Sequence, residues 1–306
     1  MNINNFLLTY EKDDEKINIK LFCDECYTKE WIYIGILIVK ENEENDLFKD
    51  ILNSRCGSKK IEKNWLNCKE IETCKYHEKN NREVHFSNLG KDKDLYHIAK
   101  RWMDYILCGN NKIRFYILGL DRTKLDLSKF GNCETNIYNR FFRTAIISPI
   151  KYFFGKNSKI NINSIYHDES TNLETHKYFP WHSLYKIEQN TDNIYIKTNK
   201  IKFINSNHKY SNNNYSHFIQ LIDLILGCFK ETFEAESTSK DKIKIATEYV
   251  PLIERMINAP NNKNSRYNYF KRYDFSFFPK ETIDDLEKIY MDKKKVSLII
   301  FIKIEK

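Results

Sequence analysis

The sequence has few residues that interrupt regular structure and no apolar run long enough to cross a membrane. Eight glycines and five prolines in 306 residues argue against a disordered or low-complexity chain. The longest apolar segments, Trp31–Val39 and Leu298–Ile302, have the length of strands. Residues 1–20 lack the basic start and the continuous apolar stretch of a secretory signal. We therefore expect a soluble, cytoplasmic protein without a membrane segment.

Apolar and charged residues are abundant. Hydrophobic residues make up 41% of the chain and aromatic residues 14%, enough for a well-packed core in one large domain or in a core with a subdomain. The net charge of +8 is compatible with a phosphate-bearing partner, because Lys and Arg displace counterions from nucleic acids. The Lys excess accompanies many Asn and Ile, a composition typical of AT-rich coding sequences. The charge alone therefore does not identify a partner.

Eight cysteines in a chain without an export signal indicate reduced thiols. Cys23 and Cys26 form one Cys-x-x-Cys pair, and a single pair is weak evidence for redox or metal chemistry. Three further thiols and an imidazole could form a tetrahedral zinc site: Cys56, Cys68, Cys74 and His77. Their spacing lacks the paired units of common zinc modules, so we interpret them as scattered residues and keep zinc as the alternative.

Apolar periodicity predicts strands that alternate with helices. Residues Ile17–Asp24 alternate apolar and polar side chains, and the β-branched run Trp31–Lys40 predicts a central strand that pairs with them as a hairpin. The other predicted strands are Glu83–Phe86, Lys112–Leu120, Lys159–Tyr166, a hairpin within Tyr185–Ile204 and a terminal strand at Val296–Ile304. The predicted helices lie near Asn45–Leu52 and at Leu95–Leu107, Thr135–Phe154, Tyr215–Phe233 and Ile243–Ile257.

This order of elements predicts an α/β protein with a mixed sheet and helices packed on it. We expect residues 1–235 to form the core, with a Cys-bearing insertion at residues 41–81. Residues 236–306 are expected to form an extension of helix and strand that packs on this core.

Three acidic positions are unusual if only packing is at stake. Asp24 ends a predicted strand and Asp168 follows another, and Asp223 lies inside an apolar helix on the same stripe as Gln220 and Gly227. Singly, each carboxylate could cap a turn or pair with an Arg. Together they fit one geometry, in which carboxylates from adjacent parallel strands and a covering helix meet at the carboxyl edge of the sheet. Their oxygens there would suit Mg²⁺.

These residues resemble a bacterial family, domain of unknown function 3800, that is assigned to the ribonuclease H-like superfamily. The resemblance covers about residues 17–235 and rests on Asp24-Glu25, Glu83-Val84-His85-Phe86, Asp168 and Gln220-Leu-Ile-Asp223-Leu-Ile-Leu-Gly227, in that order. The last motif is the most specific. The chain departs from the family where Cys26-Tyr27 replaces the usual Ser-Gly, so we expect a different turn there. The family is often linked to anti-phage or mobile-element contexts.

The resemblance implies a ribonuclease H-like fold and a metal-dependent nuclease. Two Mg²⁺ or Mn²⁺ ions would be held, for in-line cleavage of RNA or DNA, by Asp24, Glu83, Asp168 and Asp223. We expect the carboxylates of Asp24, Asp168 and Asp223 within about 8 Å of one another, the reach of a shared metal pair. Asp121, which also ends a predicted strand, is an alternative third ligand. Glu25 and Glu169 should point away from the ligands beside them.

Other residues are candidates for moving protons or binding substrate. His85 or His167 could shuttle protons, although histidines of either kind are more often packed or exposed. Arg140 and Arg143 are expected to contact phosphates in a positive strip beside the carboxylates. Gln220 is assigned to the substrate-binding set.

Two other classes of function stay open. The chain could be a non-catalytic module on the same fold that binds nucleic acid, a protein partner or a second copy. It could also be a hydrolase of nucleotides, because the same metal pair serves any phosphoryl centre. The run Arg266–Tyr273 could stack bases, or could be a core segment with exposed charges.

Overall fold

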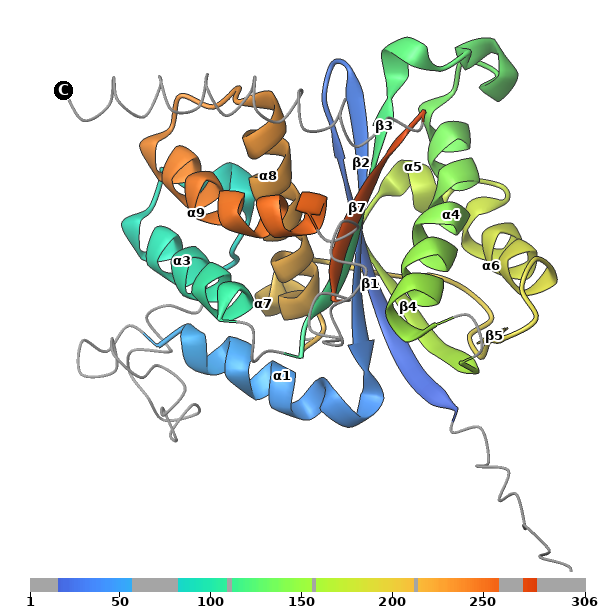
Figure 1. The fold of residues 1–306 in the computed structure, drawn as a ribbon, viewed down its shortest axis with the longest axis horizontal. Helices are drawn as coiled ribbons and strands as arrows, with labels where there is room; N and C mark the ends of the chain where they lie inside the picture. Colours follow the sequence, from blue (N-terminus) through green and yellow to red (C-terminus); the bar gives the residue numbers. More distant parts are fainter. Residues whose placement is uncertain are drawn as a thin grey trace, which may run out of the picture.

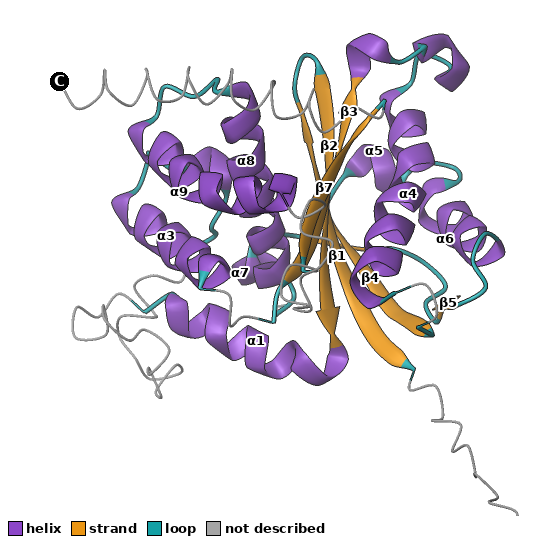
Figure 2. Cartoon of the chain, in the orientation of Figure 1, coloured by secondary structure: helices purple, strands orange, loops and turns teal. Residues whose placement is uncertain are grey.

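The structure is a computed structural model that describes residues 16–56, 82–108, 112–155, 158–211, 214–258 and 272–279. These residues form a mixed seven-stranded sheet with helices on both faces (Figure 1; Figure 2), which confirms the predicted α/β class. The strands are β1 (Ile17–Tyr27), β2 (Trp31–Lys40), β3 (Arg114–Asp121), β4 (Ile160–Asp168), β5 (Ile194–Ile196), β6 (Lys202–Ile204) and β7 (Tyr273–Phe278). None of the described helices combines the length and the apolar composition needed to span a bilayer.

The helices follow the predicted ranges closely wherever the apolar stripe is long. They are α1 (Glu41–Ser54), α3 (Lys93–Leu107), α4 (Glu134–Phe154), α5 (Thr171–Glu174), α6 (Phe179–Gln189), α7 (His208–Ser211), α8 (Ser216–Glu234) and α9 (Lys240–Asn258). The described residues also include the 3₁₀ turns η3 (Phe86–Asn88), η4 (Arg122–Lys124) and η5 (Leu127–Phe130).

The sheet has the order β5-β4-β1-β2-β3-β7, and β6 also pairs with β4. Strand β2 runs antiparallel to β1 and β3, whereas the pairs β1–β4, β4–β5, β4–β6 and β3–β7 are parallel. The predicted hairpin of β1 and β2 is therefore confirmed. Because β1 and β4 are adjacent and parallel, their carboxyl ends meet at the same edge of the sheet.

Alternating side chains on β1 separate two hydrophobic cores. Ile19, Leu21 and Cys23 face the core under α4 and α6, while Phe22 faces the core under α1, α3, α8 and α9. Figure 1 shows these two sets of helices on opposite sides of the sheet. The run in β2 is apolar at nearly every position because this strand is buried on both faces.

Two glycines let α8 lie close to its neighbours. Gly35 on β2 stands opposite Asp24 on β1, and a Cβ at Gly35 would lie 2.7 Å from Leu226 Cγ on α8. Gly227 faces Phe86, where a Cβ would lie 2.1 Å from the Phe86 Cγ. A side chain at either position would force the helix or the Phe86 ring to move.

Two predicted elements are wrong. Glu83–Phe86 forms no ladder within the described residues: its amides bond to side chains of α8, and the chain then turns into η3. The Tyr185–Ile204 region is not a hairpin, because α6 continues to Gln189 and two short strands follow, both parallel to β4. The predicted strand at Val296–Ile304 lies outside the described residues.

The segment after residue 235 contributes to the same layers. Helix α9 packs on α8 and α3, and β7 extends the sheet beside β3. Strand β7 was not predicted, because its apolar residues follow an aromatic and basic run without clear alternation.

The close contact between Gly227 and Phe86 predicts the outcome of a small substitution. In an ordinary helix interior Gly227→Ala would stabilise by about 1 kcal/mol, because Ala has the higher helix propensity. Here the added methyl group overlaps the Phe86 ring, so we expect a loss of about 1–3 kcal/mol in the free energy of unfolding. Urea unfolding of both proteins measures the difference. An unchanged or raised stability would show that Phe86 does not hold α8 at this distance.

Candidate functional site

Asp24 and Asp168 lie side by side on parallel strands. Cys23 pairs with His167 in the β1–β4 register, which sets Asp24 next to Asp168 at the carboxyl edge. The prediction that Asp24 ends its strand is wrong, because β1 continues to Tyr27. Asp24 is only 6% exposed, and its Oδ1 accepts a hydrogen bond from the Glu25 amide at 2.8 Å.

Asp223 and Glu83 reach the same edge from α8 and from the segment before η3. Asp223 Oδ2 accepts the Phe86 amide at 2.7 Å, and Glu83 Oε1 accepts the Ser206 hydroxyl at 2.7 Å. The Ser206 amide in turn donates to Asp168 Oδ1 at 3.1 Å. Ser206 therefore joins Glu83 to Asp168. We refer to Asp24, Glu83, Asp168 and Asp223 as the carboxylate cluster.

Burial and mutual repulsion raise the pKa values of the three aspartates in the cluster. Burial raises the pKa of Asp24 well above its usual range, and the charges of Asp223, Glu25 and Asp168 raise it further. Burial, with smaller contributions from Asp223 and Glu25, raises the pKa of Asp168 to about 6. The pKa of Asp223 is also raised, mainly by burial. Charged carboxylates are thus held together at a cost that protonation or a bound cation would relieve.

The donor atoms of the cluster fit a hard divalent cation. All are carboxylate oxygens, and one oxygen of each Asp is held by a backbone amide: those of Glu25, Ser206 and Phe86. Within the residues that the structure describes, however, no three Asp, Glu, His or Cys side chains are arranged so that they could hold a metal ion as they stand. The expected separation of about 8 Å or less stays a prediction.

Gln220 holds two segments of the site in place instead of facing a substrate. It is 1% exposed, and its Oε1 accepts the Val84 amide at 3.0 Å and the Arg55 guanidinium. Its Nε2 donates to the Ser206 carbonyl at 2.6 Å. One buried amide therefore connects the segment of Glu83 to the segment of Ser206. This geometry does not fit the expected substrate contact of Gln220, because both ends of its amide bind the protein.

Arg55 is a buried cation behind Gln220. Its guanidinium also donates to the Arg82 carbonyl at 2.6 Å and stacks 4.9 Å from the Trp102 ring. Burial lowers the pKa of Arg55 to about 9. The arginine therefore ties the end of α1, the start of the Glu83 segment and α8 into one unit.

The two candidate histidines lie on opposite faces of the sheet. His85 Nδ1 accepts the Ser87 amide at 3.1 Å and lies 3.4 Å from Asp223 Oδ2, so this ring lies beside the carboxylate cluster. His167 is buried under α4, where its Nε2 lies 2.6 Å from the Tyr138 hydroxyl. Burial lowers the pKa of His167 to about 4, and the ring lies on the face of the sheet opposite α8.

The structure does not bring Arg140 and Arg143 to the cluster. Both lie on α4, on the opposite face of the sheet from α8, and line a separate cavity. The predicted positive strip beside the cluster therefore does not include them. Lys242 on α9 is a cation near Asp223, and its charge opposes the rise in the pKa of Asp223.

The remaining acidic candidates have other partners. Asp121 Oδ1 caps η4 by accepting the amide and the hydroxyl of Thr123, at 3.0 and 2.6 Å. Glu25 points away from the cluster, as expected, and its Oε2 lies 3.2 Å from His167 Nε2. Glu169 accepts the Asn205 side-chain amide at 2.7 Å. None of these three adds a ligand to the cluster in the arrangement described.

The cysteines show no sign of cooperation among the described residues. Cys23 and Cys26 are three apart on β1, so they face opposite sides of the sheet, and burial raises the pKa of both thiols. Cys56 is buried. The other three members of the possible zinc site, Cys68, Cys74 and His77, lie outside the described residues.

Sequence reasoning missed Ser206 and Arg55, which hold the cluster in place. Ser206 sits in an Asn-rich loop and Arg55 at the end of a helix, and neither context differs from an ordinary polar segment. Only the three-dimensional contacts identify them. A comparison with models of known protein families finds none that matches this chain, and a comparison with curated proteins finds no similar sequence.

The raised pKa of Asp168 predicts a pH-dependent stability. Between its usual 3.8 and about 6, the folded state binds more protons at this carboxyl than the unfolded state. The free energy of unfolding should therefore fall as the pH rises through this window, by at most about 1.4 kcal/mol per pH unit for one group. Asp168→Asn should make the slope shallower and raise stability above pH 6 relative to the unchanged chain.

Urea midpoints measured between about pH 4 and pH 7 test this expectation. Asp104→Asn, on the exposed face of α3, is the matched control and should leave the slope unchanged. Equal slopes for Asp168→Asn and the unchanged chain would mean that Asp168 ionises normally in the folded state.

Proposed function

We propose that this chain is a Mg²⁺- or Mn²⁺-dependent nuclease that cleaves the phosphodiester bonds of RNA or DNA at the carboxylate cluster. The observation that carries the proposal is the meeting of Asp24, Asp168 and Asp223 from two strands and a helix, with Glu83 joined to them through Ser206. No packing requirement explains why several acidic side chains with raised pKa values occupy one edge of the sheet.

The topology supports a ribonuclease H-like assignment within this proposal. Its first three strands form an antiparallel run, β1-β2-β3, and β4 returns parallel to β1 on the other side. The late helix α8 covers the face on which Asp24 lies and supplies Asp223. The residues that carry the resemblance to domain of unknown function 3800 include all four members of the carboxylate cluster, which also supports the proposal. Participation in anti-phage defence would follow from the resemblance alone.

Asp24, Asp168 and Asp223, together with Glu83, are the residues that would hold the cations. When bound, such cations supply Lewis acidity toward water and the phosphate and neutralise developing charge. The protein positions the carboxylates. Backbone amides fix one oxygen of each Asp, and Gln220 and Arg55 hold the segment that carries Glu83. Cation binding would also relieve the repulsion that raises the pKa of Asp24.

His85 is the proposed proton donor or acceptor. Because its Nδ1 accepts the Ser87 amide, the neutral ring carries its proton on Nε2. The Asp223 carboxylate lies close by, with its Oδ2 3.4 Å from the His85 Nδ1. A ring that can hold or release a proton beside the cluster suits general acid–base assistance at a phosphodiester.

The proposal predicts separate effects on cleavage and on folding. Asp24→Asn and Asp223→Asn should lower metal-dependent cleavage by at least about a hundredfold, because each removes a charged ligand. The melting temperature without metal should stay unchanged or rise, because a repulsive charge is lost. Labelled RNA, DNA and hybrid duplexes incubated with Mg²⁺, Mn²⁺ or EDTA give the cleavage rates. Asp104→Asn is the matched control and should cleave like the unchanged chain.

The same variants distinguish the alternatives. Cleavage of nucleotides but of no polymer would favour a nucleotide hydrolase. Salt-sensitive binding of oligonucleotides without cleavage would favour a non-catalytic binding module. Full activity of both Asp variants would remove the carboxylate cluster from the reaction.

Metal binding can be measured without activity. Mg²⁺ or Mn²⁺ should raise the melting temperature of the unchanged chain in a concentration-dependent manner, because ligands that bind only the folded state stabilise it. The shift should be small or absent in Asp24→Asn. Equal shifts in both proteins would mean that the cation binds elsewhere.

A further inference from the structure

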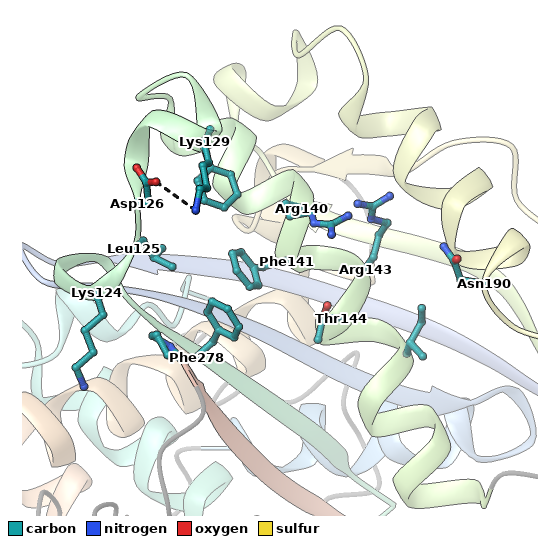
Figure 3. Close-up of a pocket in the computed structure, with 13 residues that line it drawn as sticks. Lys124, Leu125, Asp126, Lys129, Arg140, Phe141, Arg143, Thr144, Asn190 and Phe278 are labelled. Atoms are coloured by element: carbon teal, nitrogen blue, oxygen red, sulfur yellow. Dashed lines mark ion pairs between the residues drawn. The ribbon is translucent and has the colours of Figure 1, made fainter.

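A cavity lies on the face of the sheet that α4 covers (Figure 3). It measures about 750 Å³ and is bounded by α4, by the η4–η5 region and by the end of β7. This volume lies within the range of about 300–1,000 Å³ that is common for small-molecule sites. The cavity is open to solvent over polar and apolar side chains alike.

Cationic side chains outnumber acidic ones around the cavity. Lys124, Lys129, Arg140 and Arg143 line it, against the single carboxylate of Asp126. Lys129 forms an ion pair with Asp126 at 3.3 Å, so the negative charge of this carboxylate is already neutralised. For the two arginines, the structure assigns no hydrogen bond or salt bridge with any described residue. Two guanidinium groups are thus available for an anion at one wall of the cavity.

The two arginines lie close enough to repel one another. Burial lowers the pKa of Arg143, and the charge of Arg140 lowers it further. Figure 3 shows both side chains extending from neighbouring turns of α4 on the same side of the cavity. Two like charges without a described counterion are costly unless a ligand supplies the negative charge. Paired guanidinium groups in this arrangement suit a phosphate, whose oxygens accept several N–H donors.

A second wall of the cavity is aromatic. Phe278 at the end of β7 is 40% exposed, and its ring centroid lies 4.6 Å from that of Phe141 on α4. The Phe141 ring is in turn 6.1 Å from Phe130. An exposed phenyl ring supported by a buried one is a surface on which a planar heterocycle can stack.

We propose that this cavity binds a nucleoside phosphate, with the phosphate on Arg140 and Arg143 and the base against Phe278. The proposal does not depend on the nuclease proposal, since the cavity shares no residue with the carboxylate cluster and lies across the sheet from it. The nucleoside phosphate can be a free nucleotide or the 5′ end of a strand, which present the same chemistry.

Calorimetric titration of the full chain in EDTA tests the proposal, because removal of divalent cations leaves the carboxylate cluster repulsive to phosphate. The probes are ATP, AMP, pyrophosphate, adenosine and a 5′-phosphorylated oligonucleotide. We expect ATP or AMP to bind at least about tenfold more tightly than pyrophosphate or adenosine, since only a nucleotide engages both walls. Tighter binding of the oligonucleotide than of AMP, lost in the same variants, would identify a strand end as the source.

Variants assign the binding to named residues. The double variant Arg140→Ala/Arg143→Ala should weaken nucleotide binding at least about tenfold, and Arg140→Lys/Arg143→Lys should weaken it less, because charge remains while the forked geometry is lost. Phe278→Leu should weaken nucleotide binding but leave pyrophosphate binding unchanged. Arg255→Ala, an exposed arginine on α9, is the matched control. Melting temperatures close to that of the unchanged chain verify that the variants fold.

Several results would overturn the proposal. One is that no probe binds. Another is that the Arg→Lys double variant, the Arg→Ala double variant and the unchanged chain all bind nucleotide equally well. A third is that pyrophosphate binds as tightly as ATP. Loss of binding in Asp24→Asn would place the ligand at the carboxylate cluster instead. Cleavage assays run in parallel keep the two proposals apart, because the arginine variants should retain metal-dependent cleavage.

Discussion

The close approach of α8 to the sheet is the constraint on which the rest of the site depends. Gly35 lies directly opposite Asp24 in the β1–β2 register and lacks the Cβ that would collide with Leu226. Asp223 lies on the same helix, three residues before Leu226, and so comes down beside Asp24. A larger residue at the Gly35 position would lift α8 and separate the two carboxylates. Packing in the core therefore sets the electrostatics of the edge.

This packing has opposing effects on the ionisation of the aspartates in the carboxylate cluster. Burial raises the pKa values of Asp24, Asp168 and Asp223, yet backbone amides stabilise one oxygen of each in the charged form. Neutral packing would have used apolar side chains at these positions. Burial therefore favours the neutral form of these carboxyls, whereas the amide hydrogen bonds favour the charged form. A cation that entered the edge would favour the charged form as well.

Long elements with a regular apolar pattern could be predicted from the sequence, whereas short elements and contacts between distant segments could not. Helix α8 and strand β2 are recognisable because every turn or residue buries an apolar side chain. The Glu83 segment imitates a strand, but its amides bond to side chains of α8, a partner that no local pattern encodes. Periodicity places Arg140 on α4 without indicating which face of the sheet α4 covers. The prediction therefore put the two arginines beside the carboxylates, on the wrong face of the sheet.

The cluster draws its members from the first strand and from a helix late in the chain, with β4 and the Glu83 segment between them. A nascent polypeptide therefore carries no complete cluster until α8 has been synthesised and has docked on β1 and β2. A fragment that ends before Ser216 contains the residues of β1 to β6 but lacks Asp223 altogether. Any chemistry that requires Asp223 is therefore unavailable until α8 has been synthesised.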